Sequence, residues 1–175
     1  KLKHWHPSKN WIEIQTIDAH TCGEPLRIII SGFPDIIGKN LLEKRAYVKN
    51  NLDQLRKAIM WEPRGHADMY GALITEPDTP EADFGVIFIH NEGYSTGCGH
   101  AVIALTKMFV ETGLIKIEEP ITEVKMDVPS GFIRAFAEVQ NGKVKSVSFR
   151  NIPSFVQDLD SVIDIPGLGN IQYDL

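Results

Sequence analysis

The sequence predicts a mixed α/β fold of the α+β type, in which a mostly antiparallel sheet wraps around one central helix. Along the 175 residues, segments with the apolar pattern of short strands outnumber those with a helical period. The segment 101–110 is apolar on nearly every side, as expected for a helix that protein surrounds. The residues Gln140, Asn141 and Gly142 favour a tight hairpin turn, which pairs neighbouring strands antiparallel.

The first part of the chain is expected to hold an extension and two strands. Residues 1–11 are polar and aromatic without a clear period, and we expect them to be an N-terminal extension. From Trp11 the pattern becomes β-like, and residues 26–30 are a run of apolar residues and one arginine that predicts a buried strand. The glycine-containing turn 20–24 is expected to join the two strands.

The middle of the chain is expected to hold one surface helix, a pair of strands and the buried helix. Residues 40–60 carry apolar residues among many charges, which predicts a single amphipathic helix. Segments 68–75 and 84–90 are β-rich and are joined by a loop rich in proline and acidic residues, so we expect them to pair. The buried helix is expected to begin after Gly99 and to stop near Gly113.

The last part of the chain is expected to supply three more strands and then to leave the domain. The strands are predicted near 123–128, 131–139 and 144–150. Proline and polar residues after Arg150 break the pattern, and another extended segment begins near 162–167. The chain ends at Leu175 shortly afterwards, which is the pattern of a sequence cut in mid-strand.

Composition and charge exclude several classes of protein. The net charge of −5 gives no basic stripe for a phosphate backbone, so nucleic acid is not an expected partner. No apolar run approaches the roughly 20 residues of a membrane span, and the start of the chain has no signal-type apolar core, so a cytoplasmic location is the default. The two cysteines, Cys22 and Cys98, lack Cys-x-x-Cys spacing and are expected to be free thiols.

Cys98 is the residue whose position most favours chemistry. It follows a loop and immediately precedes the apolar helix, so it is expected at or beside the N-cap. Unpaired N–H groups and the positive end of the helix dipole stabilise an anion there, whether a thiolate or a bound carboxylate. Helix N-termini can bring a thiol pKa from about 8.5 into roughly the 3.5–7.5 range, where a thiolate is available at neutral pH. The alternative is that Cys98 is a small buried apolar residue.

Other residues with reactive side chains have weaker claims. Cys22 lies in a glycine-containing turn and is assigned no role. The histidines His66, His90 and His100, with Asp68, could suggest a metal site, but they lack the short paired spacing of a metal-binding motif. Histidines hydrogen-bonded near strand ends are the favoured interpretation. No metal is therefore expected.

Several ordered motifs resemble the proline racemase family, and most of all its trans-3-hydroxy-L-proline dehydratase branch. They are residues 18–27 (DAHTCGEPLR), 62–71 (EPRGHADMYG), and 90–94 with 98–100 (HNEGY and CGH). The likeness covers nearly everything from Ile14 onwards. The resemblance implies a diaminopimelate epimerase-like fold of two similar halves with the substrate between them. Residues 12–155 would then be the N-terminal lobe, and residues 156–175 the crossover and the start of a truncated second lobe.

The resemblance also implies a site and a reaction. Cys98 would be the acid/base that removes the α-proton, and the backbone N–H groups of Gly99 and His100 would bind the substrate carboxylate. The implied reaction is cofactor-independent dehydration of trans-3-hydroxy-L-proline to Δ1-pyrroline-2-carboxylate. Proline racemisation and 4-hydroxyproline 2-epimerisation are the alternatives, because the residue that distinguishes them lies in the second half.

The sequence departs from the family pattern at three places. Gly97 stands where the family often has methionine or another apolar residue, which is expected to loosen the loop, and Cys22 stands where it usually has glycine. The second half, with its Asp-Arg-Ser-Pro block, is absent, so these 175 residues alone are expected to be inactive or nearly so. A single lobe that only binds a carboxylate ligand is the non-enzymatic alternative. The expected partner is a small imino acid, and a homodimer is compatible with the sequence.

Overall fold

One curved sheet wraps around helix α3 (Gly99–Glu111) in the computed structural model, which describes residues 6–175. The sheet has eight strands in the order β1-β2-β3-β4-β6-β7-β8, with β5 paired to β4. Adjacent strands in the sheet are antiparallel, except that β2 runs parallel to β3 and β4 runs parallel to β6. The strands are β1 (Gln15–Thr21), β2 (Glu24–Ser31), β3 (Tyr70–Thr75), β4 (Phe84–His90), β5 (Tyr94–Ser95), β6 (Ile121–Val128), β7 (Gly131–Gln140) and β8 (Lys143–Arg150). The predicted fold class is confirmed.

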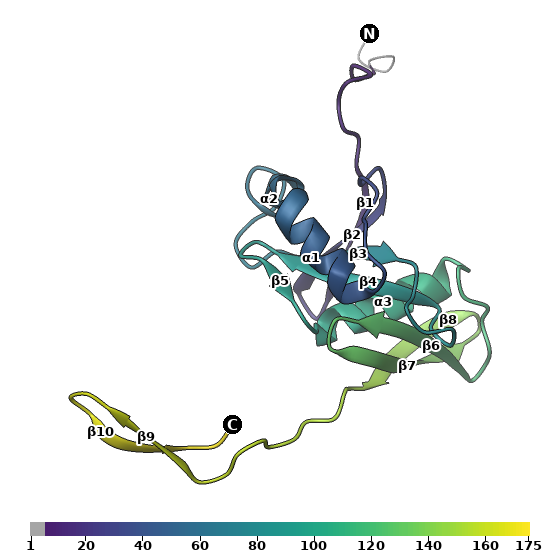
Figure 1. The fold of residues 1–175 in the computed structure, drawn as a ribbon. Coiled ribbons are helices and arrows are strands. Elements are labelled where there is room, and N and C mark those ends of the chain that lie inside the picture. The colour runs from purple at the N-terminus through teal and green to yellow at the C-terminus, as the bar shows by residue number, and fades with distance from the viewer. Residues whose placement is uncertain (1–5) are drawn as a thin grey trace.

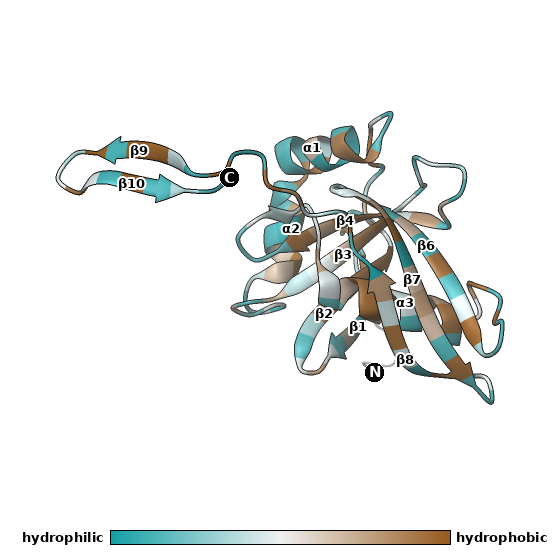
Figure 2. Cartoon of the chain, turned by 90° about the horizontal axis from the view of Figure 1, so that it is seen from below, coloured by the Kyte–Doolittle hydropathy of each residue, from teal (hydrophilic) through white to brown (hydrophobic). Residues whose placement is uncertain are grey.

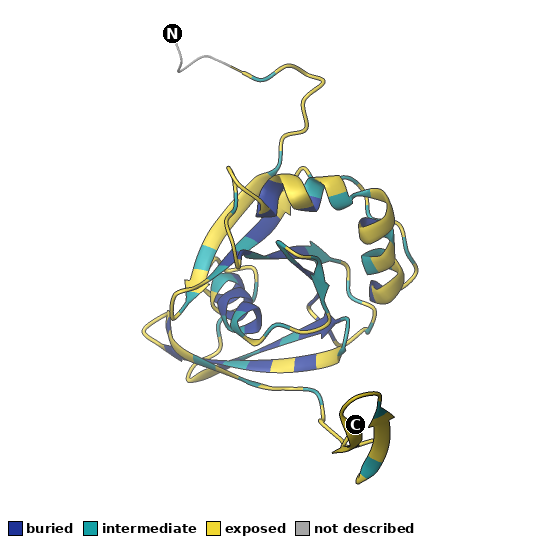
Figure 3. Ribbon diagram, turned by 90° about the vertical axis from the view of Figure 1, so that its left-hand side faces the viewer, coloured by how far each residue is buried: buried dark blue, intermediate teal, exposed yellow. Residues whose placement is uncertain are grey.

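The main core lies between α3 and the concave face of the sheet. The helix contacts β1 and β2 on one side and β7 and β8 on the other, and Figure 3 shows it enclosed by strands. Val102, Leu105 and Val110 are fully buried, and Phe109 stacks on Phe84 of β4 at 3.9 Å between ring centroids. Burying each such side chain contributes roughly 1.5–3 kcal/mol. The prediction of a helix that is apolar on nearly every side is confirmed, because protein covers it from several directions.

Two tight turns fix the register of the outer hairpins. Cys22 and Gly23 join β1 to β2 with φ angles of 52° and 101°, and Asn141 and Gly142 join β7 to β8 with φ angles of 54° and 70°. Positive φ at both central residues matches the right-handed twist of the flanking strands. The hairpin predicted from Asn141 and Gly142 is confirmed.

The prediction of one helix over residues 40–60 is wrong, because two helices occupy this segment on the other face of the sheet. Helix α1 (Leu41–Asn51) and helix α2 (Asp53–Met60) meet at Leu52, whose φ of −127° and ψ of 12° are not helical. The buried residues Leu41, Val48 and Ile59 are seven and eleven positions apart, so their apolar stripe stays in phase across the break. The spacing of the apolar residues in the sequence therefore gives no sign of the break at Leu52.

An ion pair between the buried Arg56 and the partly exposed Asp53 fixes the orientation of α2 relative to the sheet. Arg56 is only 4% exposed, and it donates to both carboxylate oxygens of Asp53 and to the backbone oxygens of His90 and Asn91. Tyr94 also donates to Asp53 at 3.0 Å. Helix α2 is thereby tied to the end of β4 and to β5.

This ion pair predicts a stability that depends on acid pH. The Arg56 guanidinium holds the pKa of Asp53 at about 2, below the ordinary 3.8, although burial opposes the shift. A depressed folded-state pKa gives stability that is present above the unfolded pKa and is lost as the pH falls through the folded value. We expect about 2 kcal/mol of unfolding free energy to disappear between about pH 5 and pH 2.

Urea unfolding at stepped pH, followed by tryptophan fluorescence, measures this loss. The Asp53→Asn variant is expected to be less stable at pH 5 and to lose less stability on acidification. Asp164→Asn is the matched control, since Asp164 is exposed and its carboxylate makes no hydrogen bond or ion pair in residues 6–175. An equal loss of stability in the two variants would contradict this role of Asp53.

The C-terminal segment forms a separate two-stranded sheet. Strands β9 (Ser161–Ile165) and β10 (Gly169–Tyr173) pair antiparallel, and Figure 2 shows them extending away from the main sheet. The predicted extended segment is confirmed, but the expected ending in mid-strand is wrong, because β10 returns along β9. Within residues 6–175, no helix is long and apolar enough to cross a membrane.

Candidate active site

Cys98 is the N-cap residue of α3, as the sequence predicts. Its φ of −155° and ψ of 101° are extended, so the chain turns into the helix directly after it. The loop before it is fixed to the turn between β6 and β7, where the backbone N–H of Ser130 donates to the Thr96 oxygen at 3.0 Å. The N–H groups of Gly99 and His100 lie in the first turn of α3, where no helical carbonyl precedes them. These two groups therefore have no partner within the helix, and their binding of a carboxylate stays a prediction.

The Cys98 thiol is harder to ionise than the sequence suggests. Burial raises the thiol pKa to about 11, the backbone N–H of Ala101 opposes this rise, and the negative charge of Glu24 adds to it. Burial therefore opposes the ionisation that the helix N-terminus favours. The physical reason is that removing the thiol from water disfavours its anion more than the helix end favours it. A thiolate here requires a neighbouring group that accepts the proton.

The imidazole of His100 is such a group. Its Nδ1 lies 3.4 Å and its Nε2 lies 3.7 Å from Cys98 Sγ, and Nε2 also lies 3.3 Å from the backbone oxygen of Pro25. Tyr70 packs against the ring edge-on, with 5.0 Å between ring centroids. The sequence interpretation used only the backbone of His100. The short separation from Cys98 was visible in the sequence, but the contact depends on the extended backbone at Cys98.

A pocket of about 320 Å³ adjoins Cys98 and has the size of a small-molecule site. One part of it is polar and another is apolar; the lining residues are Thr96, Gly97, Cys98, Gly99, Val102, Ser130, Ile133, Phe149, Asn151 and Ile152. A Cβ atom at Gly97 would lie 3.3 Å from Ser130 Oγ, and one at Gly99 would lie 3.2 Å from Phe149 Cζ. Because neither glycine has a side chain, the backbone on either side of Cys98 lies close to Ser130 and Phe149, which line the same pocket.

The remaining sequence candidates do not form a site. Cys22 is exposed in the turn of the β1–β2 hairpin. His90 stacks on Tyr70, and burial lowers its pKa. In residues 6–175, no three histidine, cysteine or acidic side chains gather as metal ligands, so the geometry does not support the site considered for His66, Asp68 and His90.

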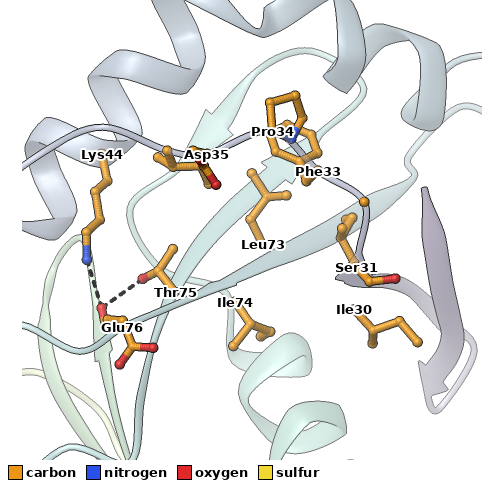
Figure 4. A pocket seen from close by; sticks show the side chains of 13 residues that line it. Ile30, Ser31, Phe33, Pro34, Asp35, Lys44, Leu73, Ile74, Thr75 and Glu76 are labelled. Carbon is orange, nitrogen blue, oxygen red and sulfur yellow. Dashed lines mark hydrogen bonds between the residues drawn. The ribbon is translucent and has the colours of Figure 1, made fainter. Parts of the chain in front are cut away.

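A second pocket, of about 310 Å³, lies between the ends of β2 and β3 and helix α1 (Figure 4). Leu73 and Lys44 are among its lining residues, and Lys44 donates to the backbone oxygen of Glu76 at 2.9 Å. The pocket contains neither cysteine nor histidine, so we assign it no chemistry.

Comparisons with known proteins identify the family of the chain. The family model described as proline racemase matches residues 16–175. The trans-3-hydroxy-L-proline dehydratase of Colwellia psychrerythraea is 49% identical over all of this chain and 50% of its own length. The proline racemase of Clostridioides difficile is 46% identical over 93% of this chain and 48% of its own length. The chain therefore spans about half the length of these relatives.

A solved structure is similar over the same extent. The hydroxyproline epimerase from Agrobacterium vitis, with bound trans-4-hydroxy-L-proline, matches with a TM-score of 0.80 and 28% identity. The match covers 92% of this chain and 48% of the epimerase. The fold described above is thus one half of a two-lobe fold.

Proposed function

The chain belongs to the proline racemase family, and from this premise we propose that it is the half of an enzyme that removes the α-proton of a proline-type imino acid. The observation that carries the proposal is the Cys98 thiol, which lies beside two unpaired N–H groups at the end of a helix and opens onto a pocket. A thiol and an anion site side by side suit a substrate whose reacting carbon bears a carboxylate.

Each residue of the site has a role in this proposal. The N–H groups of Gly99 and His100 bind the carboxylate and stabilise the charge that spreads onto it when the α-proton leaves. The thiol proton of Cys98 passes to His100 Nδ1, 3.4 Å away, and the resulting thiolate takes the α-proton. The pyrrolidine ring lies in the pocket beside Cys98. This sequence of steps uses no cofactor.

Dehydration of trans-3-hydroxy-L-proline is the reaction we favour. The substrate loses its α-proton to the thiolate and hydroxide from the β-carbon. The hydroxide takes the proton held by His100 and leaves as water, so that the thiol and the neutral imidazole are restored and an enamine remains. The enamine then becomes its imine tautomer, Δ1-pyrroline-2-carboxylate. The likeness to a trans-3-hydroxy-L-proline dehydratase over the whole chain supports this choice.

Racemisation or epimerisation is the second candidate. The likeness to a proline racemase and to a hydroxyproline epimerase supports it almost equally. Both reactions begin with the same step at Cys98, and they differ in what approaches the other face of the α-carbon. We propose that this second group belongs to a further lobe beyond residue 175.

The same lobe would explain the exposed hairpin. An isolated two-stranded hairpin is marginally stable in water. Ile163, Ile171 and Tyr173 alternate onto one face of the β9–β10 pair and are 40–48% exposed. We propose that residues 156–175 are the crossover and that this face packs on the second lobe. The cytoplasmic location and the homodimer stay predictions.

Exchange of the substrate α-proton in heavy water tests the proposal. The protein with both lobes is expected to place deuterium at the α-carbon of proline, or to release deuterium-labelled imine from trans-3-hydroxy-L-proline, as followed by NMR. The 175 residues alone are expected to exchange at least about 10²-fold more slowly, since one face of the site is missing. A two-lobe protein that binds these imino acids without exchange would instead be a carboxylate-binding module.

A further inference from the structure

The β1–β2 hairpin contacts the first turn of α3 at two points, one on each side of its tight turn. On β1, the Thr21 hydroxyl donates to the backbone oxygen of His100 at 2.9 Å. On β2, the Pro25 oxygen lies 3.3 Å from His100 Nε2. Among residues 6–175, the Thr21 bond is the only side-chain hydrogen bond between β1 and α3. His100 is thus held through its backbone and its ring by the same hairpin.

This arrangement favours one position of the ring proton. A backbone oxygen can only accept, so the contact with Pro25 requires an N–H at Nε2. In a neutral imidazole with this proton, Nδ1 is the acceptor, and it is the ring nitrogen nearer to Cys98 Sγ, at 3.4 Å against 3.7 Å for Nε2. The edge-on contact with Tyr70 restrains the ring in this orientation.

We propose that Thr21 is a positioning residue that sets the tautomer of His100. The Thr21 hydroxyl ties the hairpin to the helix, which keeps the Pro25 oxygen opposite Nε2 and leaves Nδ1 free to take the thiol proton. The role of this tautomer in turnover rests on the proposed function, whereas the tautomer itself is a property of these 175 residues.

Ring nitrogen chemical shifts test the tautomer directly. In alkaline buffer, long-range ¹H–¹⁵N correlation spectra of the 175-residue chain are expected to show His100 with its proton on Nε2. Thr21→Val removes the donor at nearly constant shape and frees the hairpin, so that the Pro25 oxygen is no longer held opposite Nε2. We expect the preference for this tautomer to fall about fivefold, the net worth of the hydrogen bond from Nε2 to Pro25. Thr21→Ser keeps the hydroxyl and should restore the preference. Thr16→Val is the matched control, because Thr16 lies on the same strand with an exposed hydroxyl that makes no hydrogen bond among the described residues.

The outcomes separate the two proposals. An unchanged His100 tautomer in folded Thr21→Val overturns the positioning role; if valine prevents folding, Thr21→Ala gives the same comparison. In the protein with both lobes, Thr21→Val is expected to lower kcat about fivefold with a smaller change in KM. A tautomer shift in a two-lobe protein without any α-proton exchange would leave Thr21 as the positioning residue and overturn the proposed function.

Discussion

Replacing Cys98 with serine in the protein that carries both lobes is expected to lower α-proton exchange of proline and trans-3-hydroxy-L-proline by about 10²–10⁴-fold. The hydroxyl is of similar shape, so the carboxylate site at Gly99 and His100 should remain. A serine hydroxyl is a far weaker acid than a thiol, so it supplies no anion to take the α-proton. Binding measured by calorimetry should therefore persist while exchange is lost.

The other cysteine provides the control for this substitution. Cys22 is exposed in a turn at a φ of 52°, which glycine adopts without strain, so Cys22→Gly should fold and exchange normally. Exchange that continues unchanged in Cys98→Ser would remove Cys98 from the mechanism. Loss of both binding and exchange would instead indicate that serine disturbs the end of α3.

Alkylation of Cys98 in the folded 175-residue chain is expected to be about two orders of magnitude slower at pH 8 than in the urea-unfolded chain. The folded thiol has a pKa of about 11, whereas an unfolded thiol titrates near 8.5. Only the thiolate reacts with iodoacetamide, so the folded rate should rise about tenfold per pH unit until it levels near pH 11. The Cys22→Gly background leaves one thiol, and mass spectrometry follows its modification.

The shape of this profile distinguishes ionisation from restricted access. If the reagent merely reached Cys98 slowly, the rate would be low at every pH but would level near the ordinary thiol pKa. A folded profile that levels near pH 8.5 would therefore contradict the effect of burial. It would also remove the need for His100 as proton acceptor.

The sequence predicts the fold well because its strongest signals are local. The apolar segment 101–110 and the pair Asn141 and Gly142 each determine their structure within a few residues. The break at Leu52 could not be predicted in this way, since the apolar stripe of α1 and α2 stays in phase across it. The contacts that tie α2 to the sheet join residues far apart in the sequence, such as Asp53 and Tyr94, which are 41 positions apart.

The site is predicted only in part for a similar reason. The place of Cys98 at the helix N-terminus follows from its immediate neighbours, and so do the unpaired N–H groups of Gly99 and His100. The thiol pKa depends on burial by distant strands, which no local pattern contains. The contacts of His100 with Thr21 and Pro25 join residues 79 and 75 positions apart, so they appear only in the folded chain.

The enclosure of α3 has a consequence for how the molecule is made. The helix is held between β1 at one edge of the sheet and β8 at the other, and more than 100 residues separate these strands along the chain. Such distant pairings are slow to form, since the chain between them must first be ordered. During synthesis, the thiol and its anion site would therefore remain unassembled until β8 has left the ribosome. A nascent chain that stops before Lys143 would contain every residue we assign to the chemistry and still lack the site.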